Sequence, residues 1–416
     1  MRVLTSDLAA HVGERVTLAG WLHARRELGA VSFVLLRDRA GLAQIVLSSS
    51  NTVLQGRGAL DLPAETVVEV DGVAVAAAQA PGGVELQEPS FRVLAEPAEA
   101  PPIELRRPVL KETLPTILDL APVALRHPRE RAKLQLAAAS LVGFREALDR
   151  LGFVEISTPK IVALATESGA SVFALDYFGR PAFLAQSPQF YKQTMVGVFE
   201  RVYETGPVFR AEPHETGRHL AEYTSLDAEL GFIRDHFDVM AVVREALAGM
   251  VGAIRERAAR AVDLLELDLP EVPHEIPWVH FAETGVDDVD LAPADERRLC
   301  EERGEWLFVT GFPMAKRPFY THPEPARPRY SNSFDLLFRG MEIVTGGQRL
   351  HRYGDYVAAL GGETGAYDGY LQAFKYGMPP HGGFALGLER WVAQLVGARN
   401  IRETTLFPRD RSRLTP

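Results

Sequence analysis

The sequence predicts an α+β fold divided between two domains. At 416 residues the chain is longer than one hydrophobic core comfortably serves. Short alternating segments fill residues 1–95, and helical and strand patterns mix over residues 129–416. A stretch rich in proline and charge, residues 96–128, separates them. We therefore expect a small β domain, a linker and a larger mixed domain with these boundaries.

Composition narrows the class of protein. With 24% charged and 46% hydrophobic residues the chain is typical of globular proteins. No apolar run could cross a bilayer and the first residues lack a signal-peptide core, so we expect a cytoplasmic protein without a membrane partner. The single cysteine, Cys300, excludes internal disulfides and cysteine-based zinc clusters. A net charge of -10 argues against unselective nucleic-acid binding but leaves a local basic patch open.

The first 95 residues read as a small barrel. Alternating or apolar segments separated by glycine, proline and polar residues occur at 16–22, 31–38, 42–47, 66–77 and 84–94. Five short strands are compatible with an OB-fold, whose exposed strand face binds single-stranded nucleic acid. The side chains that could stack on bases or bond to them are Trp21, His23, Arg25, Arg26, Phe33 and Gln44. For Trp21 and Phe33, core packing is an equal alternative.

The larger domain opens with a helix. Apolar residues recur at helical spacing from Arg129 to Leu151, and Gly152 ends the pattern as a C-cap. Residues 153–162 then indicate a strand, which Pro159 interrupts.

A loop and a second helix follow. Glu167 lies among small residues that could form a mobile lid, although an ordinary surface loop is at least as consistent. Ser187 is the expected N-cap of a helix in which Gln189 and Lys192 share one face. An amide and a cation can hold a small anion; a solvated face is the alternative.

Residues 201–232 indicate a strand, a charged loop and a second strand. Period-2 alternation places four polar side chains on one face of the second strand, Tyr223, Ser225, Asp227 and Glu229. The first strand ends with Arg210 and Glu212, and the loop adds three more basic side chains, His214, Arg218 and His219. This set suits a nucleotide, because a guanidinium can bind phosphate, an aromatic ring can stack on the base and a carboxylate can accept a hydrogen bond from an amine. A solvated hairpin is the alternative.

Residues 234–303 show helical spacing and suggest no chemistry. An apolar strand at 306–313 leads to Tyr320, which we expect to be exposed enough to meet a ligand.

Two acidic side chains converge in the next hairpin. If Arg339 and Gly340 form the turn, Leu337 lies opposite Glu342 and Asp335 is a diagonal neighbour. Two such carboxylates can share a divalent ion.

Later residues of this segment also suggest a ligand site. Thr345 and Arg349 follow Glu342, while Gly346 and Gly347 leave room for a ligand. A glycine-rich strand beginning near residue 374 then passes into a helix that starts close to Gly387. Arg390 in its first turn favours a nearby anion, because a helix N-terminus is already positive.

Together these stretches resemble the three signature motifs of class II aminoacyl-tRNA synthetases, specifically the aspartyl enzymes of archaeal type. GFREALDRLGFVEISTPKIV resembles motif 1, with Pro159 at a dimer interface; FRAEPHETGRHLAEYTSLDAELGF resembles motif 2; GFALGLER resembles motif 3. The resemblance covers nearly the whole chain. It implies an OB-fold anticodon-binding barrel followed by a class II catalytic domain, a mainly antiparallel sheet flanked by helices, in a homodimer.

The resemblance also implies roles. ATP would meet Arg210, Glu212, His219, Tyr223, Glu342 and Arg390, with Arg210, Arg390 and Glu342 catalytic and Tyr223 stacked on adenine opposite Arg390. Mg²⁺ would be held by Asp335 and Glu342 with Thr345 nearby. L-Aspartate would meet Glu167, Gln189, Lys192, Arg210, Asp227, Tyr320, Thr345 and Arg349.

The anticodon site implied by the resemblance comprises Trp21, His23, Arg25, Phe33, Gln44 and Gly82. In archaeal-type aspartyl enzymes that accept only tRNA(Asp), the place that His23 resembles has a tryptophan, and the place that residues 81–83 resemble has a lysine that helps read the third anticodon base; this chain has His23 and Gly82 there. A smaller ring and a missing cation predict a non-discriminating enzyme that charges tRNA(Asp) and tRNA(Asn). An amidotransferase would then convert the mischarged product.

Three alternatives remain. An asparaginyl enzyme shares motifs 2 and 3, and Lys192 argues against it because a buried ammonium needs an anion. The intact barrel argues against a paralogue that makes asparagine without tRNA. The complete set Arg210, Asp335, Glu342 and Arg390 argues against a non-catalytic RNA-binding relative. Two features stay open: Ala221, where relatives often have asparagine, and the arginine-rich C-terminal residues, which resemble the family's end or form a solvated tail.

Overall fold

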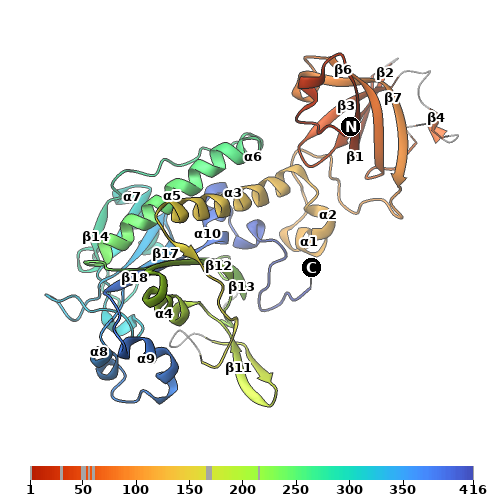
Figure 1. Cartoon of the computed structure of the whole chain (residues 1–416). Helices are drawn as coiled ribbons and strands as arrows, with labels where there is room; N and C mark the ends of the chain where they lie inside the picture. Colours follow the sequence, from red (N-terminus) through yellow and green to blue (C-terminus); the bar gives the residue numbers. More distant parts are fainter. Residues whose placement is uncertain are drawn as a thin grey trace. The chain divides into compact units, whose positions relative to one another are not determined.

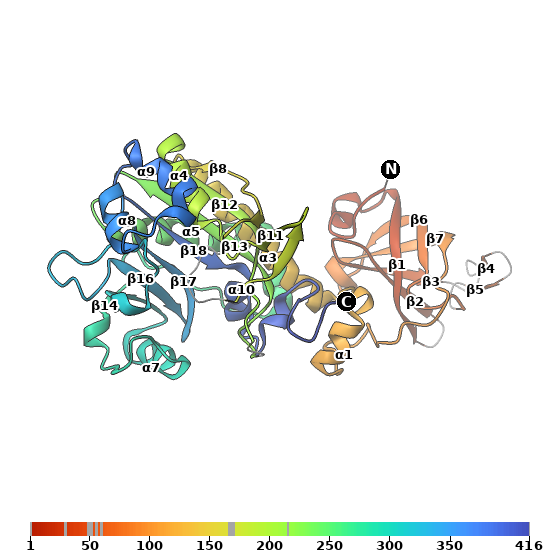
Figure 2. The same ribbon diagram turned by 90° about the horizontal axis from the view of Figure 1, so that it is seen from below.

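The computed structural model describes residues 2–28, 31–47, 53–54, 57–58, 61–164, 171–213 and 216–415. The chain divides into two compact units, residues 1–130 and 131–416. Figures 1 and 2 show the elements of each unit from two directions. The expected linker, residues 96–128, belongs to the first unit, where its Ile103, Leu105 and Leu110 pack with Ala124 in a small apolar cluster. The three-part boundaries stay a prediction.

The first unit contains a closed barrel in the order β1-β2-β3-β7-β6. Its strands are β1 (Arg15–Leu28), β2 (Val31–Arg37), β3 (Leu42–Leu47), β6 (Val67–Ala76) and β7 (Val84–Ala95). These match the five predicted segments, because period-2 alternation turns one set of side chains inward. The inward set includes Leu18, Val34, Leu36 and Ile45, all fully buried.

Smaller elements complete this unit. They are η1 (Leu8–His11), β4 (Val53–Leu54), β5 (Arg57–Gly58), η2 (Pro81–Gly83), α1 (Leu114–Asp119) and α2 (Ala121–Ala124). Helix α3 (Pro128–Arg150) leads into the second unit. Its end confirms the predicted C-cap region, since Gly152 has a φ of 78° that favours glycine.

The second unit is built on an eight-stranded sheet in the order β14-β15-β16-β17-β18-β13-β12-β8. Neighbours pair antiparallel except β14 with β15 and β12 with β8. The strands are β8 (Val154–Glu155), β12 (Arg201–Phe209), β13 (Glu222–Gly231), β14 (Trp278–His280), β15 (Trp306–Thr310), β16 (Ser333–Phe338), β17 (Met341–Gln348) and β18 (His381–Gly387). A smaller sheet contains β9 (Ile161–Val162), β10 (Ala174–Tyr177) and β11 (Arg180–Leu184).

Helices cover both faces of the large sheet (Figures 1 and 2). They are α4 (Gln189–Phe199), α5 (His236–Arg257), α6 (Ala259–Leu265), α7 (Pro293–Arg303), α8 (Tyr353–Ala359), α9 (Asp368–Lys375) and α10 (Leu388–Val396). Short 3₁₀ turns are η3 (Phe281–Glu283), η4 (Met314–Lys316), η5 (Gly365–Tyr367) and η6 (Ile401–Thr404). No helix in the described part of the chain has both the length and the hydropathy to span a membrane.

The two faces of β13 carry different side chains, as predicted. Leu226, Ala228 and Leu230 are buried in the main core with residues of α3, α5 and α10. Asp227 and Glu229 lie on the opposite face, where α4 packs. The sheet therefore separates an apolar layer from a polar one.

Helices α3 and α5 lie side by side and touch at two glycines (Figure 1). A Cβ added at Gly143 would lie 2.4 Å from the Gly249 carbonyl oxygen. One added at Gly249 would lie 2.7 Å from the Ala147 Cβ. The helix backbones therefore approach more closely than alanine allows.

We expect Gly249→Ala to lower the free energy of unfolding by about 1–3 kcal/mol, because overpacking forces the two helices apart. Gly252→Ala, in the same helix but facing open space, should instead raise it by about 0.5–1 kcal/mol. Urea unfolding of both variants measures the difference. Equal shifts for the two variants would show that the helix crossing is not tight.

Candidate active site

One row of side chains crosses four strands of the large sheet on its polar face. Asp335 of β16 pairs with Thr345 of β17, Thr345 with Ala385 of β18, and Ala385 with Asp227 of β13. In antiparallel pairs such directly opposed residues point to the same side. The sheet register thus brings together residues more than a hundred positions apart.

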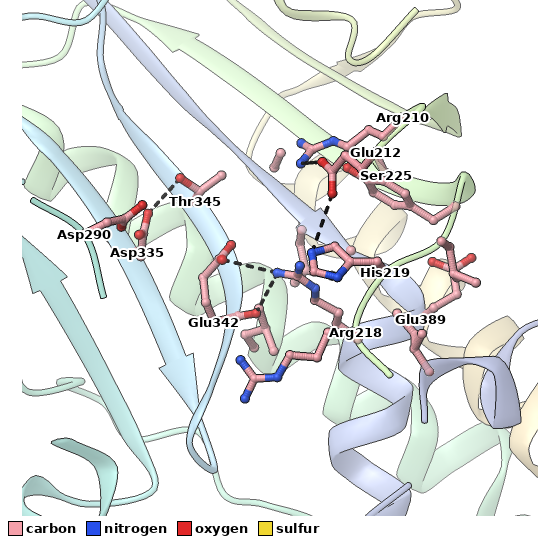
Figure 3. A pocket seen from close by; sticks show the side chains of 18 of the residues that line it. Arg210, Glu212, Arg218, His219, Ser225, Asp290, Asp335, Glu342, Thr345 and Glu389 are labelled. Atoms are coloured by element: carbon pink, nitrogen blue, oxygen red, sulfur yellow. Dashed lines mark hydrogen bonds and ion pairs between the residues drawn. The ribbon is translucent and has the colours of Figure 1, made fainter. Parts of the chain in front are cut away.

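A pocket of about 280 Å³ opens on this face. All six residues expected to meet ATP line it: Arg210, Glu212, His219, Tyr223, Glu342 and Arg390. Figure 3 shows Arg210 and Glu212 on one side, Asp335 and Thr345 on the other, and Glu342 between them. The motif 2 hairpin, the β16–β17 hairpin and α10 therefore form one site.

Charged pairs organise the pocket. The Glu212 carboxylate lies 3.6 Å from Arg210 and 3.6 Å from the His219 ring. The Arg210 guanidinium lies 5.6 Å from the Tyr223 ring centre, whereas Arg390 pairs with Glu342 at 3.2 Å. The cation found over Tyr223 is thus Arg210; the ring's other partner, expected to be Arg390 on a bound base, stays a prediction.

The acidic pair at the far wall fits a hard cation. Thr345 Oγ1 donates to Asp335 Oδ1 at 2.8 Å. Burial raises the pKa of the Asp335 carboxyl to about 6; the Arg317 guanidinium, 3.5 Å away, opposes this and Glu342 adds to it. Among the described residues no three acidic, histidine or cysteine side chains form a metal cage. Mg²⁺ commonly needs only one or two carboxylates together with substrate phosphates, so the donor set fits.

Of the residues expected to bind the amino acid, Arg210 and Thr345 line the pocket, whereas Gln189, Lys192, Asp227, Tyr320 and Arg349 are buried and do not line it. Lys192 is fully buried and lies 3.0 Å from Asp227 and 3.4 Å from Glu229. Arg349 Nε donates to Glu229 at 3.0 Å. Burial acts to raise the pKa of the Glu229 carboxyl, but Arg349 and Lys192 outweigh it and hold that pKa below its ordinary value. Ser225, which lines the pocket, donates to Asp227 and joins the two regions.

This network corrects the argument made from Lys192. The ammonium is already compensated by two carboxylates, so its burial does not by itself require an anionic substrate. The Gln189 side-chain amide nitrogen, in contrast, is buried without a hydrogen-bond partner among the described residues. It is therefore a donor available to a ligand.

Other expectations about this region were wrong or untested. Tyr320 is buried, with 4% of its surface exposed, because its ring packs under the Arg349 guanidinium at 5.6 Å. The N-cap of α4 is Pro188, since the helix begins one residue later than Ser187 predicted. Glu167 lies outside the described residues.

Several residues of the site were missed from the sequence. Besides Arg218 and Ser225 of the predicted hairpin, the pocket wall contains Asp290, Arg317 and Glu389, which the sequence did not suggest. Asp290 comes from the 234–303 region, where no chemistry was expected, and Glu296 of α7 receives a 2.7 Å bond from Arg218. No local pattern marks these residues, because only the fold brings them to the pocket.

The barrel presents part of its predicted interface on the outer strand face. Trp21, Phe33 and Gln44 alternate with core residues, and the Arg37 guanidinium lies 5.6 Å from the Trp21 ring centre. His23 sits at a β-bulge of β1 and is buried, with its ring 3.2 Å from Arg37.

Three other residues of the predicted anticodon site, Gln44, Arg25 and Gly82, have different surroundings. Gln44 is largely buried and donates to Glu85 at 3.0 Å, and Arg25 donates to the Leu62 carbonyl. Gly82 is exposed in η2 with a φ of 71°, which favours glycine. Trp21 and Phe33 are half-buried, and Arg26, opposite Phe33 in the strand pairing, is exposed, so two rings and one cation remain at least partly accessible.

A polar pocket on a mainly antiparallel sheet, in one chain with a five-stranded barrel, agrees with the architecture implied by the resemblance to class II tRNA synthetases. Residues 115–411 match the family described as tRNA synthetases class II (D, K and N), and residues 16–94 match the OB-fold nucleic acid binding domain. The chain belongs to this D, K and N family of class II tRNA synthetases. Both parts of the predicted fold class are confirmed.

Relatives and solved structures resemble the chain over its full length. It is 46% identical to the aspartate–tRNA(Asp/Asn) ligase of Thermus thermophilus, covering 100% of both chains, and 46% identical to that of Deinococcus radiodurans, covering 100% and 99%. The asparaginyl-tRNA synthetase of Pyrococcus horikoshii complexed with asparaginyl-adenylate superposes with a TM-score of 0.93 at 31% identity, covering 100% of both chains. The aspartyl-tRNA synthetase of Entamoeba histolytica gives 0.85 at 28%, covering 100% and 93%.

We expect Lys192→Met to lower the free energy of unfolding by about 3–5 kcal/mol, because it leaves Asp227 and Glu229 buried without their shared cation. Lys316→Met, at an exposed position of the same unit, is the control and should change it by less than about 0.5 kcal/mol. Urea unfolding measures both. A wild-type midpoint for Lys192→Met would show that the network does not depend on this charge.

A second prediction concerns acid stability. Burial lowers the pKa of the His381 imidazole from 6.5 to about 4. The unfolded chain therefore binds more protons between these two values, and stability should fall as the pH drops from 6.5 to 4. The loss from this group is about 3 kcal/mol.

His381→Gln removes this titration, so its unfolding free energy should decline less steeply over that window than the wild-type value. Exposed His274→Gln is the control and should keep the wild-type slope. Urea unfolding at several pH values gives the slopes. Identical slopes for His381→Gln and wild type would contradict a neutral buried imidazole.

Proposed function

We propose that the chain is an aspartate–tRNA ligase that activates L-aspartate with ATP and transfers the aspartyl group to tRNA(Asp) and tRNA(Asn). The observation that carries the proposal is the adjacency of two sites on one sheet face. A pocket with Arg210, Arg390 and an acidic pair adjoins the buried network around Lys192. The names of the full-length relatives give the same activity.

The first step joins the aspartate α-carboxylate to the ATP α-phosphate and releases pyrophosphate. Arg210 and Arg390, the catalytic cations, stabilise the charge that develops on the phosphates. Glu212 and Tyr223 bind adenine and His219 meets the outer phosphates. Asp335 and Glu342, with Thr345 beside them, would hold Mg²⁺, which would neutralise phosphate charge there.

The second step transfers the aspartyl group to the 3′-hydroxyl of the terminal tRNA ribose, and no protein nucleophile is needed. Gln189 and Asp227 bind the amino group of aspartate, and Lys192 and Arg349 bind its side-chain carboxylate, with Tyr320 supporting Arg349. The unpartnered Gln189 amide supports this assignment. Glu167 closes over the amino acid.

The protein acts as a homodimer through motif 1. Support comes from β8, the last strand of the large sheet among the described residues, whose Val154 is 40% exposed. Ile161 in the same motif is 48% exposed. Such an uncovered apolar edge favours association. The expected cytoplasmic location stays a prediction.

Anticodon recognition falls to the barrel residues Trp21, His23, Arg25, Phe33, Gln44 and Gly82. The small ring at His23 and the bare Gly82 favour acceptance of both tRNAs. Aspartyl-tRNA(Asn) then requires an amidotransferase to become asparaginyl-tRNA(Asn).

Asparaginyl transfer is the second candidate. The structural likeness to the Pyrococcus horikoshii asparaginyl enzyme favours it, and the Lys192 network carries no net charge that would reject an amide. The 46% identity to ligases named for aspartate outweighs this likeness.

We expect ATP–pyrophosphate exchange to depend on aspartate, and purified tRNA(Asn) to be aspartylated at about a tenth or more of the rate on tRNA(Asp). Exchange that asparagine supports better than aspartate would overturn the amino-acid assignment. A tRNA(Asn) rate below about a hundredth of the tRNA(Asp) rate would overturn dual specificity alone.

A further inference from the structure

The C-terminal residues, left open by the sequence, bond to the main chain of the motif 2 loop. The Ile401 amide donates to the Gly217 carbonyl at 2.9 Å, and the Ala221 amide donates to the Arg409 carbonyl at 2.8 Å. Arg411 Nη1 donates to the Pro213 carbonyl at 3.2 Å. These contacts reach both sides of the loop.

Arg402 joins the loop to the segment. Its Nη1 donates to the Thr216 carbonyl at 3.1 Å, and its Nε donates to the Asp410 carboxylate. Both side chains are more than nine-tenths buried. Asp410 in turn accepts the amides of Ser412 and Arg413. The Arg402 guanidinium thus holds the folded-back C-terminal segment at a fixed position relative to the Thr216 carbonyl of the loop.

The motif 2 loop and the C-terminal segment pack closely, which leaves little room for one to shift against the other. A Cβ at Gly217 would lie 3.0 Å from the Arg399 carbonyl oxygen, so the loop and the segment are in close contact there. Ile401 itself lines the pocket. The segment also reaches α10, because Thr404 Oγ1 donates to the Glu389 carbonyl at 3.2 Å.

The motif 2 loop that these bonds hold carries residues of the proposed ATP pocket. Arg218 and His219 lie between the bonded positions Gly217 and Ala221, and Arg210 donates its amide to the Ala221 carbonyl at 2.9 Å. Ala221 therefore acts through both of its main-chain groups. Neither bond requires a polar side chain at position 221.

We propose that residues 400–413 are a positioning element for the nucleotide and that Arg402 is its positioning residue. Arg402 acts through the Thr216 carbonyl and the Asp410 carboxylate to hold His219 where it meets ATP and Arg218 at the pocket wall. This inference rests on the proposed ATP site.

The test separates the affinity for ATP from that for aspartate in aspartate-dependent ATP–pyrophosphate exchange. Arg402→Gln, and Asp410→Asn, which keeps an acceptor oxygen for the Ser412 and Arg413 amides, should each raise the KM for ATP about tenfold. The KM for aspartate should change less than about threefold. Arg402→Lys, which keeps the charge, should restore part of the ATP affinity.

Two further variants distinguish the role of residues 400–413 from that of the ATP pocket itself. Leu414→Ala, at a side chain that is 82% exposed and lies just after this segment, should leave both KM values unchanged. Arg390→Ala tests the pocket itself: an unchanged KM for ATP in that variant would overturn the ATP site. A normal KM for ATP in Asp410→Asn, together with a raised KM for ATP in Arg390→Ala, would overturn the positioning role of residues 400–413 and leave the ATP site in place.

Thermal unfolding of each variant completes the test. A purely structural role predicts a lower melting temperature with parallel changes in both KM values, and that result would also overturn the proposal. If Arg402→Gln does not fold, Asp410→Asn decides by the same criteria.

Discussion

A buried network of two cations and two carboxylates fixes the centre of the catalytic unit. Lys192 and Arg349 bond to Asp227 and Glu229, and each cation also donates to a carbonyl of β18, Phe384 or Gly383. Helix α4, strands β13 and β18 and the residue that follows β17 are thereby held together by charges that have left water, where a missing partner is costly. Glycine at 383 is required, because a Cβ there would lie 2.0 Å from a Glu229 oxygen.

The register of the large sheet determines which polar side chains lie around this network. The row from Asp335 through Thr345 and Ala385 to Asp227 places the acidic wall beside the amino-acid region. Because side chains alternate between faces, a slip of one residue would bury these groups in the core. The apolar face, packed against α3, α5 and α10, prevents such a slip, so the stability of the core maintains the geometry of the site.

The residues that would meet the nucleotide depend on a different support. Arg210 and Tyr223 sit at the ends of strands, but Arg218 and His219 lie on a loop whose main chain bonds to the C-terminal segment. Loops are less constrained than strands and need such contacts to hold side chains precisely enough for binding. The last residues of the chain are thus part of the catalytic unit, as Arg402 and Asp410 demonstrate by their burial.

The sequence by itself determined the barrel strands, the polar and apolar faces of β13, the turn at Arg339 and Gly340, and six of the residues that line the pocket. Local periodicity and ordered motifs carry that information because they concern neighbours along the chain. Only the tertiary structure decided that Lys192 is already neutralised, that Tyr320 is buried, that Asp290 lines the pocket and that Arg402 bonds to the motif 2 loop. Burial and charge pairing depend on partners far apart in the sequence, which no spacing rule identifies.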